Sequence, residues 1–147
     1  MYGLLLLLHL LAATIWTGGH IVLSLAILPR ALRERSAHQL LQFESAYEKI
    51  GMPALFVQIV TGLMLAHRML PDFNQWLNFS NPLSRPLMLK FTLLALTAVI
   101  ALHARFRVIP YLCDKNLTLM AWHIVPVTIL SVLFVFAGVS FRTGWLY

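Results

Sequence analysis

Four long apolar runs constrain this sequence more than any other feature. They cover residues 4–28, 52–66, 86–102 and 120–139, and each holds no more than one Lys, Arg, Asp or Glu. A helix rises about 1.5 Å per residue and needs about 20 residues to cross about 30 Å of hydrocarbon. We therefore predict an all-α integral membrane protein, a single four-helix transmembrane bundle in the lipid bilayer. Its helices are expected at residues 3–28, 51–69, 86–106 and 119–140.

The overall composition excludes a soluble domain. Hydrophobic residues make up 60% of the 147 residues and charged residues only 11%, with a mean hydropathy of +0.80. A soluble domain has about a quarter of its residues charged. A net charge of +6 is compatible with nucleic-acid binding, but the basic residues lie between the apolar runs. They are better explained by membrane topology, and we expect no nucleic-acid partner.

The distribution of basic residues predicts the orientation. The connections after the first and third helices hold seven of them, and the opposite side holds four. Basic loops favour the cytoplasm, so we expect a multi-pass protein of a bacterial-type inner membrane with both termini on the periplasmic side. The amphipathic segment at residues 31–50 predicts either a short surface helix or an extension of the second helix.

Two histidines bracket the stretch HLLAATIWTGGH in the first helix. His9 and His20 are eleven residues apart, which at about 100° per residue leaves them about 20° apart on the helix and about 16 Å apart along its axis. Trp16 lies on the same stripe. Because a polar side chain facing lipid lacks a partner, we expect this face to contact protein.

Topology sorts the histidines by depth. His9 and His67 are predicted in the outer half of the bundle, and His20, His103 and His123 in the inner half. Two histidines at one depth on different helices suit axial ligation of a haem iron in an apolar slot. We expect His9 with His67 at an outer haem b and His20 with His103 or His123 at an inner one. Trp16 is a candidate haem contact.

Basic side chains near each surface are candidate partners for haem propionates. The candidates are Arg105 and Arg107 inside, and Arg68, Lys90 and Arg142 outside.

Copper is the alternative metal for the same five histidines. Imidazole binds Cu(II), whereas Cu(I) pathways commonly use Cys and Met sulfur. The sequence has one cysteine, Cys113 in a predicted cytoplasmic connection, and its six methionines form no M-x-x-M or M-x-x-x-M cluster. This ligand set favours haem over a cuprous channel.

Several motifs together resemble the copper-resistance D (CopD) family over essentially the whole chain. They are H-x6-W-x-G-G from His9 to Gly19, the entry YEKIGMPAL, the L-K-F opening around Lys90, the terminal His103 of the third helix and the proline-bearing fourth helix. The layout is also distantly similar to the HemJ family of haem-binding proteins that oxidise protoporphyrinogen. The resemblance implies a four-helix fold and equates His9 and Lys90 with residues of those families. HemJ-like chains have no histidine at the position of His20.

Three functions follow from the sequence. The first is a b-type haem protein that transfers electrons across the membrane, with one or two haems, a quinone or another carrier as its partner, and a homodimer as its assembly. The second is a copper-transport or copper-resistance membrane protein. The third is a protoporphyrinogen oxidase-like enzyme, against which His20 argues.

Overall fold

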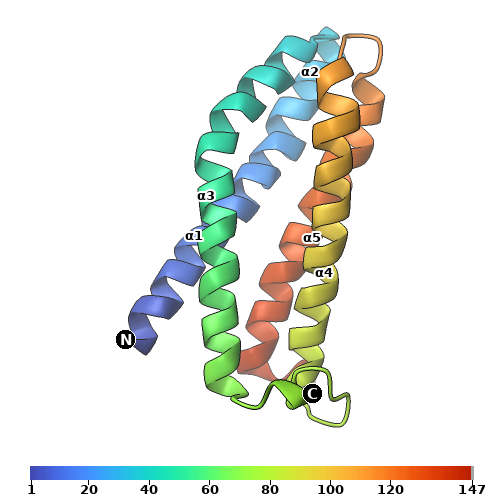
Figure 1. The fold of residues 1–147 in the computed structure, drawn as a ribbon. Helices are drawn as coiled ribbons and strands as arrows, with labels where there is room; N and C mark the ends of the chain where they lie inside the picture. Colours follow the sequence, from blue (N-terminus) through green and yellow to red (C-terminus); the bar gives the residue numbers. More distant parts are fainter. Residues whose placement is uncertain (147) are drawn as a thin grey trace.

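The computed structural model describes residues 1–146, which fold into an up-and-down bundle of helices (Figure 1). Four continuous helical segments are long and apolar enough to cross a membrane, which confirms the predicted all-α membrane fold. These segments are Tyr2–Glu34, Ala37–Met69, Ser84–Tyr111 and Leu117–Thr143. The first segment consists of α1 (Tyr2–Val22), the π-helical turn η1 (Leu23–Ile27) and α2 (Leu28–Glu34), and the second is α3 (Ala37–Met69). The third consists of α4 (Ser84–His103), the π-helical turn η3 (Ala104–Val108) and the 3-10 turn η4 (Ile109–Tyr111), and the fourth is α5 (Leu117–Thr143). A further 3-10 turn, η2 (Phe73–Gln75), lies in the loop before α4.

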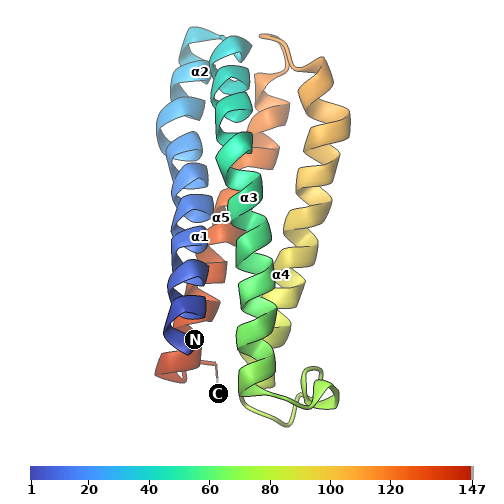
Figure 2. The ribbon, with the colours of Figure 1, turned by 60° about the vertical axis from the view of Figure 1, so that its left-hand side comes forward.

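Both termini lie at one end of the bundle and both basic connections at the other (Figures 1 and 2). We call the end with the termini the outer end, following the orientation predicted from charge. At the inner end, the Asp114 carboxylate accepts a hydrogen bond of 2.7 Å from the backbone N–H of Ala37, the first residue of α3. The connection after α4 therefore caps the start of α3 and joins the two halves of the chain.

Two π-helical turns carry the first and third segments past prolines. η1 ends two residues before Pro29, and η3 ends two residues before Pro110. A proline ring has no N–H and clashes with the carbonyl four residues earlier, and a widened turn relieves both problems inside a membrane. As a result the first segment continues to Glu34 instead of ending near residue 28, and the third continues to Tyr111.

The second segment begins at Ala37, well before the predicted start near residue 51. The amphipathic stretch thus extends the second helix, which is one of the two alternatives that the sequence left open.

Asp72 accepts a hydrogen bond from the backbone of Asn74 in the outer loop, where η2 lies.

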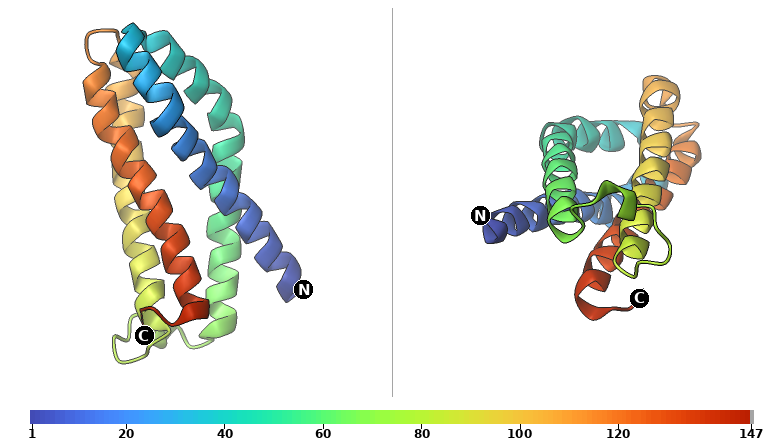
Figure 3. Two further views of the ribbon diagram at one scale, coloured as in Figure 1. Left: turned by 180° about the vertical axis from the view of Figure 1, so that it is seen from behind. Right: turned by 60° about the horizontal axis from the view of Figure 1, so that its bottom comes forward.

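Helix packing divides the bundle into two pairs. α1 packs mainly on α3, α4 packs mainly on α5, and contacts of α1 with α5 join the pairs. Seen from behind, α1 crosses the bundle obliquely so that its N-terminal end lies beside α3 and away from α5 (Figure 3). Apolar side chains of η1, α2, α3, η3 and α5 form a core cluster at the inner end, around Leu28, Leu40 and Ile124.

Candidate functional site: imidazoles within the bundle

His9 is held by α3. Its Nδ1 lies 3.0 Å from both the Gln58 carbonyl oxygen and Thr61 Oγ1. The Thr61 hydroxyl donates to the Val57 carbonyl at 2.6 Å, so its oxygen accepts from His9 and the proton resides on His9 Nδ1. The Nε2 atom then carries the free lone pair. The close approach of this ring to α3 depends on Gly62, where a Cβ would lie 3.1 Å from His9 Cε1.

His20 lies one level further in, between Trp16 and Tyr47. Its Nδ1 donates to the Trp16 carbonyl at 2.9 Å, again leaving Nε2 with the lone pair. Its ring lies 4.4 Å from the buried Trp16 ring and meets Tyr47 edge-on at 5.6 Å. The Tyr47 hydroxyl donates to the same Trp16 carbonyl at 2.9 Å. This group fixes the imidazole at the interface of α1 and α3.

Tyr47 fits there because two glycines make room for its ring. A Cβ on Gly19 would overlap the ring and lie 2.6 Å from the hydroxyl oxygen, and a Cβ on Gly51 would lie 2.8 Å from Cε1. Tyr47 is not among the site residues predicted from the sequence. A usable signal was present in the spacing of Tyr47 and Gly51, one helical turn apart in the family-like motif YEKIGMPAL.

His103 and His123 form the inner imidazole pair. His123 Nδ1 donates to the Leu119 carbonyl at 2.8 Å, so His123 Nε2 accepts a hydrogen bond of 2.8 Å from His103 Nδ1. The two rings are nearly coplanar, with 7° between their planes. Of the three histidines predicted in the inner half, His103 and His123 are therefore in contact with each other. His103 is exposed, and its Nε2 atom keeps a free lone pair.

His67 does not join His9. Its ring stacks on Phe73 of the outer loop, with centroids 5.1 Å apart, and Phe73 in turn contacts Trp76. His67 lies six residues beyond Thr61 on α3, which places it about 9 Å further along the axis. The predicted pairing of His20 with His103 or His123 is not seen either. The His20 ring contacts Trp16 of α1 and Tyr47 of α3, whereas His103 and His123 pair with each other at the ends of α4 and α5.

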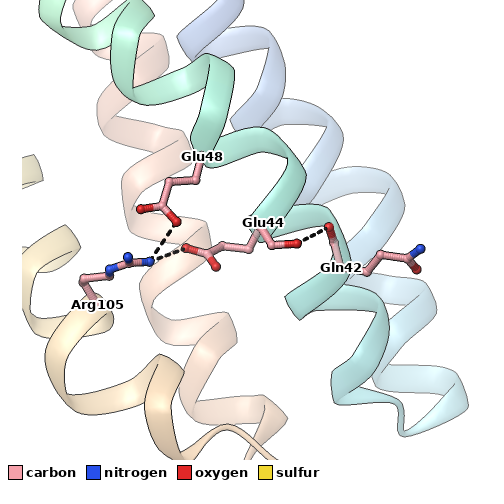
Figure 4. A network of polar contacts seen from close by, with 5 residues as sticks. Gln42, Glu44, Glu48 and Arg105 are labelled. Carbon is pink, nitrogen blue, oxygen red and sulfur yellow. Dashed lines mark hydrogen bonds and ion pairs between the residues drawn. The ribbon is translucent and has the colours of Figure 1, made fainter.

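Two of the five basic candidates, Lys90 and Arg105, have different surroundings. Lys90 is half-buried in the outer half, with Nζ 5.5 Å from the Phe141 ring centroid and 3.5 Å from where a Cβ on Gly138 would lie. Arg105 instead forms ion pairs with Glu48 at 2.9 Å and Glu44 at 3.7 Å, which tie η3, the turn after α4, to α3 (Figure 4).

Comparison with known proteins adds one finding. A family model described as copper resistance protein D matches residues 41–141. The chain belongs to the copper resistance protein D family. No curated protein and no solved structure matches it. Family membership confirms the resemblance seen in the sequence and indicates a copper-resistance membrane protein; the distant HemJ likeness stays a prediction.

Within this family member, the matched stretch contains His67, Lys90, His103 and His123, while His9 and His20 precede it. Across residues 1–146, no three His, Cys, Asp or Glu side chains converge on a position for a metal ion. The imidazoles instead act singly or, at the inner end, as a pair.

The geometry of the inner pair bears on which group it can hold. A metal with bonds of about 2 Å to two imidazole nitrogens sets those nitrogens about 3 to 4 Å apart at tetrahedral to linear angles. His103 Nδ1 and His123 Nε2 are 2.8 Å apart and share a proton in a hydrogen bond, so an ion between them requires His103 Nδ1 to give up that proton. The predicted haem pairs were instead His9 with His67 and His20 with His103 or His123. The bis-histidine haem pairs expected from the sequence are not assembled in this arrangement.

Proposed function

We propose that this family member binds copper ions through imidazole nitrogens inside its bundle and passes them across the membrane. One observation carries the proposal. His9, His20 and His123 each donate Nδ1–H to a backbone carbonyl, which places the lone pair of the neutral ring on Nε2. In the inner pair His123 Nε2 accepts from His103 Nδ1, so the free lone pair of that pair is on His103 Nε2. Metal-binding histidines characteristically donate their second ring nitrogen in this way, because that hydrogen bond orients the ring and raises its basicity.

The ligand chemistry suits copper. Imidazole nitrogen is a good donor for copper, and the ring must be neutral to bind it. A neutral ligand is also compatible with the interior of a membrane bundle, where an unpaired charge costs several kcal/mol or more. Arg105 near the inner pair is already neutralised by Glu44 and Glu48, which lowers its repulsion of an incoming cation.

The positions of the imidazoles support passage in steps. His9 lies toward the outer end, His20 lies about 16 Å further along the same helix, and the inner pair lies at the end of α4 and the start of α5. Conduction requires sites that bind an ion firmly enough to admit it and weakly enough to release it. Sites of one or two nitrogens on separate helices meet this requirement better than a closed cage of four ligands.

The direct test measures copper bound to the purified protein and copper taken up by proteoliposomes. We expect His103→Ala and His123→Ala each to lower both quantities at least several-fold. His38→Ala is the matched control, since His38 is an exposed histidine near the start of α3, and it is expected to behave as the unaltered protein. Equal uptake by all four proteins would refute copper passage through the inner pair.

Electron transfer through haem b is the second candidate, favoured by the half-buried ammonium of Lys90 in the same outer half of the bundle as His9. His9 offers an axial nitrogen, and an ammonium group in the outer half can pair with a propionate. Bound haem would supply one-electron chemistry, while His9 would hold it, Lys90 would anchor its charge, and a quinone would be a suitable partner. An α-band in the dithionite-reduced spectrum, lost in His9→Ala, would support this candidate; its absence in protein purified from haem-replete cells would exclude it.

A further inference from the structure

Three buried polar atoms in the bundle have no hydrogen-bond partner among the described residues. They are Trp16 Nε1 on α1, Gln58 Oε1 on α3 and Thr97 Oγ1 on α4. The Trp16 side chain belongs to a residue only 6% exposed, and Thr97 is 3% exposed. Since the bilayer supplies no water at this depth, each atom requires a partner inside the protein or loses its hydrogen bond at a cost in free energy.

The register of α4 and α5 places Thr97 in the middle of the bundle. Lys90 of α4 lies against Gly138 of α5, and the two helices are antiparallel. Seven residues further along α4 is Thr97, and seven residues back along α5 is Ser131, so these two share a depth. The Ser131 carbonyl accepts a hydrogen bond of 3.3 Å from Thr17, the neighbour of Trp16. Thr97 and Trp16 therefore lie in one transverse layer.

Gln58 connects this layer to the outer imidazole. Its backbone carbonyl accepts the His9 Nδ1–H, so its side chain starts at the level of His9. Trp16, at the other extreme, packs against His20 at 4.4 Å. The three unpartnered atoms thus occupy the stretch of the bundle between the His9 and His20 imidazoles.

We propose that Trp16 Nε1, Gln58 Oε1 and Thr97 Oγ1 hold ordered water molecules in the centre of the membrane. The indole nitrogen donates, the amide oxygen accepts and the hydroxyl does both, so each atom can bond a buried water. Gln58 holds its water at the level of His9, and Trp16 and Thr97 hold theirs about 10 Å further in. The hydrated layer has a consequence that rests on the proposed function: water oxygens there complete the coordination of a copper ion as it moves from His9 to His20.

Radiolytic hydroxyl-radical labelling tests the hydration without reference to copper. X-rays generate radicals from water beside a side chain, so we expect Trp16 of the full chain in detergent to be labelled rapidly. Met120 is the dry control, since it is oxidised easily but lies 6% exposed in an apolar cluster. Labelling of Trp16 no faster than that of Met120 would overturn the proposal.

Variants of Thr97 provide the second arm. Thr97→Val removes the hydroxyl at almost constant volume and is expected to lower Trp16 labelling at least threefold, whereas Thr97→Ser keeps the hydroxyl and the labelling. Thr92→Val is the matched control, because Thr92 is exposed on the same helix and bonds its own turn at Met88. Equal labelling in Thr97→Val and Thr92→Val would show that Thr97 holds no water. Should Thr97→Val fail to fold, Thr97→Ser together with the Met120 comparison still decides the hydration.

Copper uptake into proteoliposomes separates this inference from the proposed function. Rapid labelling of Trp16 with uptake reduced in Thr97→Val supports both. Rapid labelling with no copper uptake by any form of the protein supports the hydrated layer and refutes the proposed function. Slow labelling with copper uptake intact refutes the layer and leaves the function standing.

Discussion

The contact between α1 and α3 should depend on the second glycine of the Gly18–Gly19 pair. In Gly19→Ala the new Cβ would occupy space filled by the Tyr47 ring, and Gly51 packs against another edge of that ring. Overpacking of this kind costs about 1–3 kcal/mol. Displacing the ring also breaks the hydrogen bond from its hydroxyl to the Trp16 carbonyl, worth about 0.5–1.5 kcal/mol. We expect the free energy of unfolding to fall by about 2–4 kcal/mol.

Gly18→Ala is the matched control for this substitution. No atom lies within 4 Å of its Cβ position, and alanine favours a helix over glycine by up to about 1 kcal/mol, so stability should be unchanged or raised. The assay is unfolding of the purified protein in mixed micelles by titration with a denaturing detergent. Equal stabilities of the two variants would refute the reasoning. So would a Gly19→Ala penalty that persists undiminished when Tyr47 is also replaced by alanine.

The remaining predictions concern the imidazoles and the ion pair. Thr61→Val removes one acceptor of His9 Nδ1 and should cost about 0.5–1.5 kcal/mol in unfolding free energy and lower copper retention; unchanged values for both would contradict the assigned tautomer. Arg105→Gln should lower the free energy of unfolding by less than about 1 kcal/mol in the same assay, because the ion pair between Arg105 and Glu48 is partly exposed to solvent. A larger loss of unfolding free energy would contradict the weak contribution that we infer for this ion pair. Acidification should release bound copper as protons compete for the imidazole nitrogens, and metal retention that does not change across acidic buffers would contradict binding by histidine.

The sequence predicted the fold because hydrocarbon thickness fixes the length of a spanning helix. The helix ends were harder to predict for a local reason. Pro29 suggested the end of the first helix, but the π turn at Leu23–Ile27 accommodates it and the helix continues to Glu34. The segment before Gly51 had enough polar residues for a surface helix, and its cap at Asp114 comes from a distant part of the chain. Long-range contacts of this kind leave no local pattern.

The shared face of His9 and His20 followed from helical periodicity alone, and both side chains contact α3. Predicting whether His67 pairs with His9 also requires knowing which face of α3 is turned toward α1. His67 is six residues from Thr61, or about 240° around the helix, so it cannot point to the face that holds His9. Depth placed His103 and His123 together correctly because they lie at adjoining ends of consecutive helices.

The metal and pigment content of protein purified from native membranes tests the central claim most directly. The measurement combines elemental analysis with a reduced-minus-oxidised optical spectrum of one preparation. We expect copper in the unaltered protein, little copper in the His103→Ala, His123→Ala double variant, and no b-type α-band in either. A b-type spectrum with no copper above that of the double variant would contradict copper handling and establish the haem alternative.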